Sequence, residues 1–136
     1  LLEAEGDIVL VVDALWRQKD PNPSSRTRDL VTCSEEFDSS YLGNEGVRLM
    51  NIAHDIPENE IHGEWIGLAK FSDVGIQKLR EEIQKFSKSG GLETASMTEL
   101  FKRLLRSGSE IRVEYIAGHW LDVDNSGDLS EAQKFL

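Results

Sequence analysis

The amino-acid sequence predicts an α/β fold built from a mixed, mostly parallel sheet with flanking helices. One observation is an unbroken β-branched apolar run over Ile8–Val12, which is typical of a central strand buried on both faces. The other is that strand-like segments are interspersed with segments whose apolar residues recur at helical spacing. The length of 136 residues is that of a single domain.

Four further segments have strand character. Asp29–Ser34 and Val47–Ala53 lie on either side of a polar, glycine-containing stretch. Glu64–Phe71 and Ile111–Tyr115 alternate in the manner of strands. In Glu64–Phe71 the alternation places four residues on one face: Trp65, Gly67, Ala69 and Phe71.

A first helix is predicted over residues 73–88. Apolar residues recur at helical spacing from Ile76 to Phe86, and Ser72 or Asp73 can cap the first turn. The pair Lys78 and Glu82 is spaced i,i+4, so we expect both on a solvated outer face.

A second helix is predicted over residues 96–107. It begins with the capping box Ser96-Met97-Thr98-Glu99 and ends at Gly108. Its apolar positions are those of a core-facing stripe, so its Met and Phe need no cofactor to explain them.

Composition excludes several classes of function. With 15 basic and 25 acidic residues the formal charge is −10, which speaks against nucleic acids and anionic membrane surfaces as partners. The longest apolar run, Ile8–Val12, is far too short to span a bilayer. The single cysteine, Cys33, excludes a disulfide framework and reads as a small apolar strand residue. No secretory signal precedes Leu1, so the expected compartment is the cytoplasm.

The densest chemistry lies in the acidic turn Asp122–Ser130. Its oxygen donors and its glycine follow the calcium loop of an EF-hand, which makes a calcium-binding or protein-interaction module the alternative function. Against it, Gln133 stands at the twelfth position, and the residues before the turn are strand-like and contain Gly118.

A second interpretation places Asp122 and Asp124 at the end of a strand, where two carboxylates can reach one Mg²⁺ ion. A third assigns them to local turns, with Asp128 capping a short terminal helix. The residues alone leave these interpretations open.

Three segments in a fixed order resemble a known family. They are Gly6–Asp13 (GDIVLVVD), Gly63–Leu68 (GEWIGL) and His119–Asp124 (HWLDVD), the last leading to Asp128-Leu129. Together they resemble the sugar-nucleotidyltransferase-like domain found fused behind phosphoenolpyruvate mutase in phosphonate biosynthesis. The likeness runs from about Gly6 to Ala132. It implies a nucleotide-diphospho-sugar-transferase-like (GT-A-like) fold and transfer of a cytidylyl group from CTP to a small phosphonate or phosphate, foremost 2-aminoethylphosphonate.

The resemblance also implies roles for individual residues. A Mg²⁺ ligand of the family maps onto Asp122 or Asp124, and His119 lies beside them in a supporting position. Glu64 and Gly67 would line the acceptor pocket, with Glu64 facing a positively charged amine. Trp65 or Trp16 would pack against that cation.

The family's glycine-rich basic loop and its first metal-binding aspartate have no counterpart in this sequence. We therefore expect residues 1–136 to be the C-terminal portion of one nucleotidyltransferase domain, without its N-terminal nucleotide-binding half. The expected catalyst is the full-length protein, with a mutase domain upstream where the fusion exists. The 136 residues alone are expected to be inactive.

Overall fold

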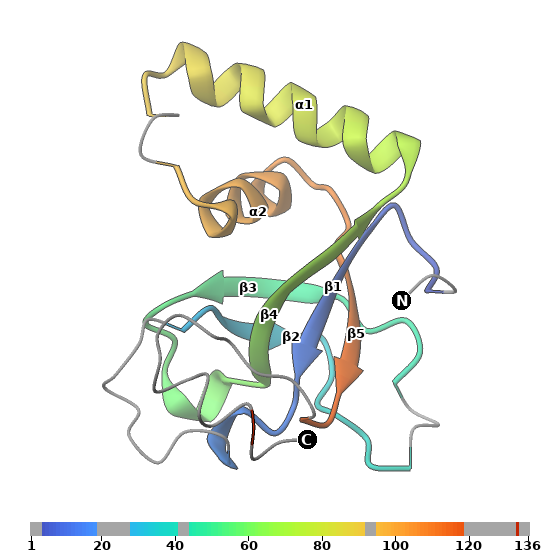
Figure 1. Ribbon diagram of the computed structural model, residues 1–136. Coiled ribbons are helices and arrows are strands. Elements are labelled where there is room, and N and C mark those ends of the chain that lie inside the picture. The colour runs from blue at the N-terminus through green and yellow to red at the C-terminus, as the bar shows by residue number, and fades with distance from the viewer. Residues whose placement is uncertain (1–3, 19–27, 41–43, 92–94, 119–132, 134–136) are drawn as a thin grey trace.

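The computed structural model describes residues 4–18, 28–40, 44–91, 95–118 and 133. Figure 1 shows the strands and helices that they form. The strands are β1 (Ile8–Asp13), β2 (Leu30–Cys33), β3 (Leu49–Ala53), β4 (Gly63–Phe71) and β5 (Arg112–Ile116). The α-helices are α1 (Asp73–Lys88) and α2 (Met97–Arg106), and short 3-10 turns lie at Trp16–Gln18 and Glu58–Glu60. The predicted α/β class is confirmed, and the five predicted strands and the helices predicted over 73–88 and 96–107 match to within two residues at either end. The two 3-10 turns were not predicted.

The strands form one sheet in the order β3-β2-β4-β1-β5. Only β1 and β5 are parallel, whereas the three other neighbouring pairs are antiparallel. The prediction of a mostly parallel sheet is therefore wrong. A parallel neighbour requires a long crossover, and the described residues between β1 and β4 contain no α-helix. Only β5, which follows α1 and α2, returns parallel to β1.

The segment Val47–Leu49, at the start of β3, forms hydrogen bonds with residues at the start of β5. The Val113 N–H donates to the Val47 carbonyl at 2.9 Å, and the Leu49 N–H donates to the Ile111 carbonyl at 2.8 Å. Leu49 also pairs in register with Cys33 of β2. The edge strands β3 and β5 are thus connected at one end, and the sheet is partly closed.

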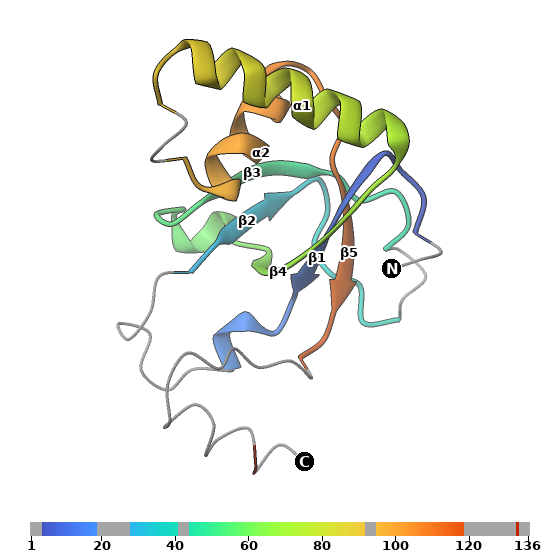
Figure 2. The same ribbon diagram turned by 45° about the horizontal axis from the view of Figure 1, so that its top comes forward.

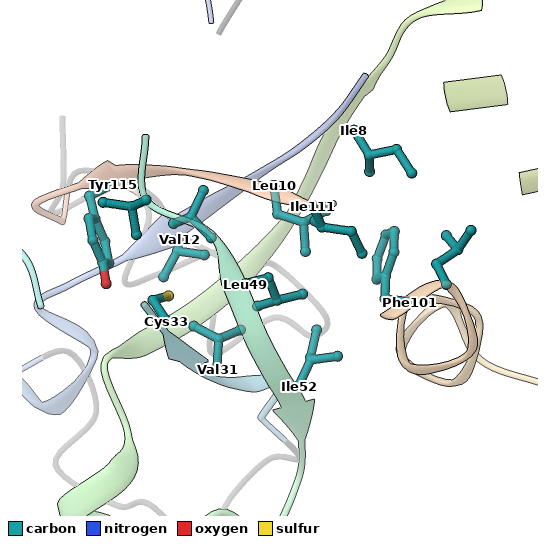
Figure 3. Close-up of a cluster of buried hydrophobic side chains, with 13 residues drawn as sticks. Ile8, Leu10, Val12, Val31, Cys33, Leu49, Ile52, Phe101, Ile111 and Tyr115 are labelled. Atoms are coloured by element: carbon teal, nitrogen blue, oxygen red, sulfur yellow. The ribbon is translucent and has the colours of Figure 1, made fainter. Parts of the chain in front are cut away.

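The hydrophobic core lies inside this partly closed sheet, as Figure 3 shows. β1 contributes Ile8, Leu10 and Val12, each fully buried. α2 contributes Phe101, whose ring meets that of Trp65 edge-on at 5.1 Å between centroids. All six residues of β1 are buried, which confirms the prediction of a strand buried on both faces.

β4 carries a bulge at the point where the predicted alternation breaks. Leu10 pairs with Ala69 and Val12 pairs with Trp65, so residues 66–68 lie opposite a single residue of β1. Gly67 lies within the bulge with a φ of 88°, a conformation that glycine adopts most easily. Trp65 and Ala69 pack against the core from one face, as predicted, whereas Gly67 does not.

Both helices lie on the same side of the sheet, with α2 against the core and α1 outermost (Figures 1 and 2). The predicted N-caps are confirmed, because Ser72 Oγ accepts from the Gly75 N–H at 3.0 Å and Ser96 Oγ accepts from the Glu99 N–H at 3.3 Å. Among the described residues, no helix combines the length and the apolar character needed to cross a membrane.

The inner side of α1 carries a buried carboxylate. Glu82 is 4% exposed and forms ion pairs with Arg103 Nε of α2 at 3.6 Å and with Lys85 Nζ at 3.7 Å. Its carboxylate also accepts a hydrogen bond from Ser107 Oγ. The Arg103 guanidinium lies over the Phe86 ring, 4.3 Å from its centroid. These contacts dock α1 on α2, and we call Glu82, Arg103 and Ser107 the helix clamp.

The first turn of α1 is fixed to the start of β1. The Ser72 N–H donates to the Asp7 carbonyl at 2.8 Å, and Ser72 Oγ donates to the Asp7 carboxylate at 2.7 Å. A Cβ on Gly75 would lie 2.0 Å from the Asp7 carbonyl oxygen, so only glycine allows this approach. Lys78 pairs with Asp7 at 3.7 Å. The predicted pair of Lys78 with Glu82 on a solvated face is therefore wrong, because Glu82 faces α2.

Candidate functional site

Two buried acidic residues lie next to each other at the ends of the strands that point away from the helices. Because β1 and β5 are parallel, their carboxyl ends both lie here (Figure 1). Asp13 is the last residue of β1 and is fully buried. β4 begins here, and Glu64 lies directly opposite Asp13 in the antiparallel register, 2% exposed. We call Asp13, Glu64 and Gly118, which follows β5, the carboxylate edge.

The Asp13 carboxylate is bound by backbone N–H groups from two turns. Its Oδ1 accepts from Leu15 N at 2.9 Å and from Gly118 N at 2.9 Å. Next to it, the Ala14 N–H donates to the Ile116 carbonyl at 2.9 Å and so extends the parallel pairing beyond β1. Hydrogen bonds from backbone N–H groups stabilise a buried carboxylate. Asp13 thus connects the turn after β1 to the turn after β5.

Glu64 lies on the face of the sheet opposite the core. Directly opposite residues of an antiparallel pair share a face, and Glu64 is opposite both Asp13 and Leu30. Its neighbour Trp65 points to the core side. Asp13 and Glu64 both have further interaction partners. Two carboxyl-bearing residues thus lie opposite each other on this face of the sheet.

Trp16 lies on the same face as Glu64. It packs against a small apolar cluster that contains Leu30, which is itself opposite Glu64. The guanidinium carbons of Arg17 and Arg28 lie 5.2 and 5.5 Å from the centroid of its ring. Arg28 Nη1 also donates to the Trp16 carbonyl at 3.2 Å. The indole therefore already has two cationic side chains beside it.

Trp65 and Gly67 lie apart from this pair. The Trp65 ring packs on Phe101 in the core, and its Nε1 donates to the Leu68 carbonyl at 2.9 Å across the bulge. A Cβ on Gly67 would meet no atom within 4 Å. The structure thus brings Glu64 and Trp16 to one face and places Trp65 and Gly67 elsewhere. The acceptor-binding roles assigned to these four residues stay predictions.

The predicted metal ligands Asp122 and Asp124, and the supporting His119, lie outside the described residues. Gly118 directly precedes this segment in the sequence and is anchored to Asp13. Within the described ranges, no three His, Cys, Asp or Glu side chains are grouped closely enough to hold a metal ion. The residues just before the acidic turn form the strand β5, where an EF-hand would have its entering helix.

Asp13 has a place in the site that sequence reasoning missed. The available signal was an acidic residue that directly ends a buried apolar run at the carboxyl end of a strand. The same pattern is found at strand ends that contact a ligand and at strand ends that do not. The hydrogen bond that gives Asp13 its place joins it to Gly118, 105 positions later in the sequence.

Cys33 is a core residue of β2, as predicted. It is 4% exposed, and burial raises the pKa of its thiol to about 11, although a hydrogen bond with Tyr115 partly opposes the rise. A thiol with a raised pKa is a poor nucleophile at neutral pH. Cys33 therefore belongs to the packing of the sheet and not to the site.

The described part of the chain thus offers an acidic edge whose buried Asp13 anchors the backbone ahead of the HWLDVD segment. Glu64 and Trp16 share the face beside it. Comparison of the chain with protein-family models, with curated proteins and with solved structures finds no match.

Proposed function

We propose that this chain is the C-terminal portion of a GT-A-like, Mg²⁺-dependent nucleotidyltransferase domain. It transfers a cytidylyl group from CTP to 2-aminoethylphosphonate, and its natural setting is a fusion with a phosphoenolpyruvate mutase. One observation carries the proposal. Asp13, buried at the carboxyl end of a parallel strand pair, binds the Gly118 N–H directly ahead of the HWLDVD segment. Ligands of α/β sheets gather outside this end of the strands.

The metal-binding role falls to Asp122 or Asp124. Their carboxylate oxygens are the donors that Mg²⁺ prefers, and nitrogen or sulfur ligands are not needed. When bound, Mg²⁺ neutralises the negative charge that builds up on the leaving pyrophosphate. In the transfer, an acceptor oxygen forms a bond to the α-phosphorus while the bond from that phosphorus to the β-phosphate oxygen breaks, and pyrophosphate leaves.

The acceptor side of the reaction falls to Glu64 and Trp16. An aminoethyl group carries a positive charge, and Glu64 supplies negative charge on the same face as Trp16. Two guanidinium groups already lie beside the Trp16 indole, so an acceptor amine would have to displace one of them to pack on the ring.

The calcium-binding alternative lacks support at one point. An EF-hand requires a helix that enters the acidic loop. β5 occupies Arg112–Ile116 and pairs in parallel with β1 over its whole length. The nucleotidyltransferase interpretation instead requires a strand at this position.

The proposal is tested by pyrophosphate release from CTP and 2-aminoethylphosphonate, catalysed by the full-length protein. We expect Asp122→Ala or Asp124→Ala to lower the rate about a hundredfold or more, on the scale of lost charge stabilisation. Asp73→Ala, an exposed carboxylate at the start of α1, is the matched control and should keep the wild-type rate.

Full activity in both site variants would remove the metal-ligand assignment. Micromolar Ca²⁺ binding by the 136 residues, measured by calorimetry, would favour the EF-hand alternative. Turnover by these 136 residues alone would contradict the expectation that half of the active site lies elsewhere.

A further inference from the structure

The side chain of His62 supplies a hydrogen-bond acceptor at the point where the pairing of β2 with β4 ends. The register of these two strands runs as far as Val31, which lies opposite Gly63. The N–H groups of alternate strand residues point to the same side, so the N–H of Cys33 also faces the β4 side. It donates to Nδ1 of the His62 ring at 2.8 Å, where a regular ladder would offer a backbone carbonyl. An imidazole nitrogen therefore extends the sheet beyond the paired backbone.

This hydrogen bond selects the neutral form of the His62 ring. A backbone N–H can only donate, so Nδ1 must offer its lone pair and the ring proton must lie on Nε2. Protonation adds a proton to Nδ1, and two donors then face each other. Turning the ring over would bring Cδ2–H to the same place, which offers no acceptor either. Cys33 is buried, so the loss of a partner for its N–H is unfavourable.

His54, which follows β3, has the opposite arrangement. Its Nδ1 lies 2.8 Å from the Arg28 carbonyl oxygen, which can only accept, so here Nδ1 carries the proton. Asp29 Oδ1 lies 3.6 Å from the same nitrogen. A second proton on Nε2 leaves the hydrogen bond of His54 intact and adds attraction to Asp29. Protonation is thus compatible with the contacts of His54 and incompatible with that of His62.

The charged groups around His62 favour its cationic form only when the ring has left β2. Four exposed carboxylates belong to the adjoining segments, namely Glu35, Glu36, Glu58 and Glu60. Of the described residues, no carboxylate forms an ion pair with the bound ring, and Arg17 pairs with Glu58 at 3.9 Å. Glu64 of β4 is buried. On the core side, burial raises the pKa of the Cys33 thiol to about 11 and also raises the pKa of Tyr115, so both keep their protons at neutral and acidic pH.

We propose that His62 is a pH-sensitive switch that holds the segment between β3 and β4, residues 54–62, onto β2. The neutral ring binds the Cys33 N–H, and protonation releases it. Near the ring, Thr32 Oγ1 donates to the Glu60 carbonyl at 2.8 Å, so this end of the segment has few contacts that could replace the lost one. The contribution of His62 to stability is complete well above pH 6.5, about where histidine ordinarily titrates, and is lost as the pH falls below it. The inference does not depend on the nucleotidyltransferase function.

The test follows hydrogen exchange of the Cys33 amide in the full-length protein by NMR with ¹⁵N-cysteine, corrected for the intrinsic effect of pH on exchange. We expect the protection of this amide to fall about fivefold or more between about pH 7.5 and about pH 5.0, on the scale of one hydrogen bond and over the range in which histidine titrates. His62→Asn is the decisive variant. The Asn Oδ1 atom stands at the position of the His Nδ1 atom and accepts at every pH, so protection should no longer depend on pH.

His54→Asn is the matched control, because its amide nitrogen can still donate to the Arg28 carbonyl. In this variant the Cys33 amide should respond to pH as in the wild type. In the wild type at neutral pH, ring ¹⁵N shifts should place the proton of His62 on Nε2 and that of His54 on Nδ1. The inference would be overturned by a proton on Nδ1 of His62, by a wild-type Cys33 amide whose protection does not change with pH, or by a pH response that persists in His62→Asn. The two wild-type measurements decide the matter even if the variant does not fold.

Discussion

The helix clamp and the carboxylate edge each bury an acidic side chain, but they bind it in different ways. Glu82 pairs with the charged side chains of Arg103 and Lys85, which come from α2 and α1. Asp13 accepts from the backbone N–H groups of two turns. A pair of side chains docks one helix on another, whereas a carboxylate bound to the backbone determines the path of the chain. The first arrangement joins two helices, and the second joins the turns that follow β1 and β5.

The largest effect is expected at the helix-covered end. In Gly75→Ala, the new Cβ would lie 2.0 Å from the Asp7 carbonyl oxygen and 2.9 Å from its carbon, so α1 must move away from β1. Overpacking costs about 1–3 kcal/mol and occasionally more, and we expect a loss of about 3 kcal/mol in the free energy of unfolding. Urea unfolding measures it. Gly67→Ala is the control, with open space around its Cβ, and should cost about 1–2 kcal/mol through its left-handed φ. Equal losses would contradict the close approach.

The next largest effect compares a buried ion pair of the helices with a more exposed one. Glu82→Gln removes the buried negative charge that pairs with Arg103. We expect this variant to lower the free energy of unfolding by about 2 kcal/mol. The matched change Glu99→Gln affects an exposed pair with Lys102, 3.9 Å apart, and should cost less than about 0.5 kcal/mol. Chemical denaturation of both variants gives the comparison. A similar, small loss in both would show that burial does not strengthen the helix clamp.

The smallest effect concerns Cys33, inside the sheet between the two regions. Burial raises the pKa of this thiol from 9.0 to about 11, so the folded protein keeps a proton that the unfolded chain has lost. Its contribution to stability is complete below pH 9, is smaller by about 1 kcal/mol at pH 10, and is lost as the pH rises through about 11. The measurement is urea unfolding between pH 8 and 11 with Cys33→Ala as the reference. The wild type should lose stability more steeply, and identical slopes would contradict the raised pKa.

The helices could be predicted almost residue by residue, because their signals are local. Ser96 and Glu99 of the capping box lie three positions apart, and the cap they predict is present. Ser72 likewise caps α1. The position of Glu82 could not be predicted in this way, because its partner Arg103 comes from another helix.

The pairing of the strands was harder to predict from the sequence, because it too depends on contacts between distant residues. The run Ile8–Val12 indicated a central buried strand, and this is confirmed. The run does not specify the direction of its neighbours, which depends on how many residues connect them. The bulge around Gly67 also leaves little signal, because a glycine in an alternating segment fits a regular strand as well. The hydrogen bond between Asp13 and Gly118 could not be predicted either, because it joins residues 105 positions apart in the sequence.

The place of β1 in the sheet has a consequence for synthesis on the ribosome. β1 ends at Asp13, yet its parallel partner β5 ends at Ile116, 103 residues later (116 − 13). At about 5–20 residues per second, the nascent chain carries β1 without its β5 partner for roughly 5–20 s, although β4 emerges earlier and can pair with its other side. An exposed β-branched run of this kind is prone to associate with other chains. Asp7 and Asp13 flank it on both sides, and charges in such positions oppose that association. We therefore expect Asp13, which anchors Gly118 in the folded protein, also to oppose association of the unfinished chain.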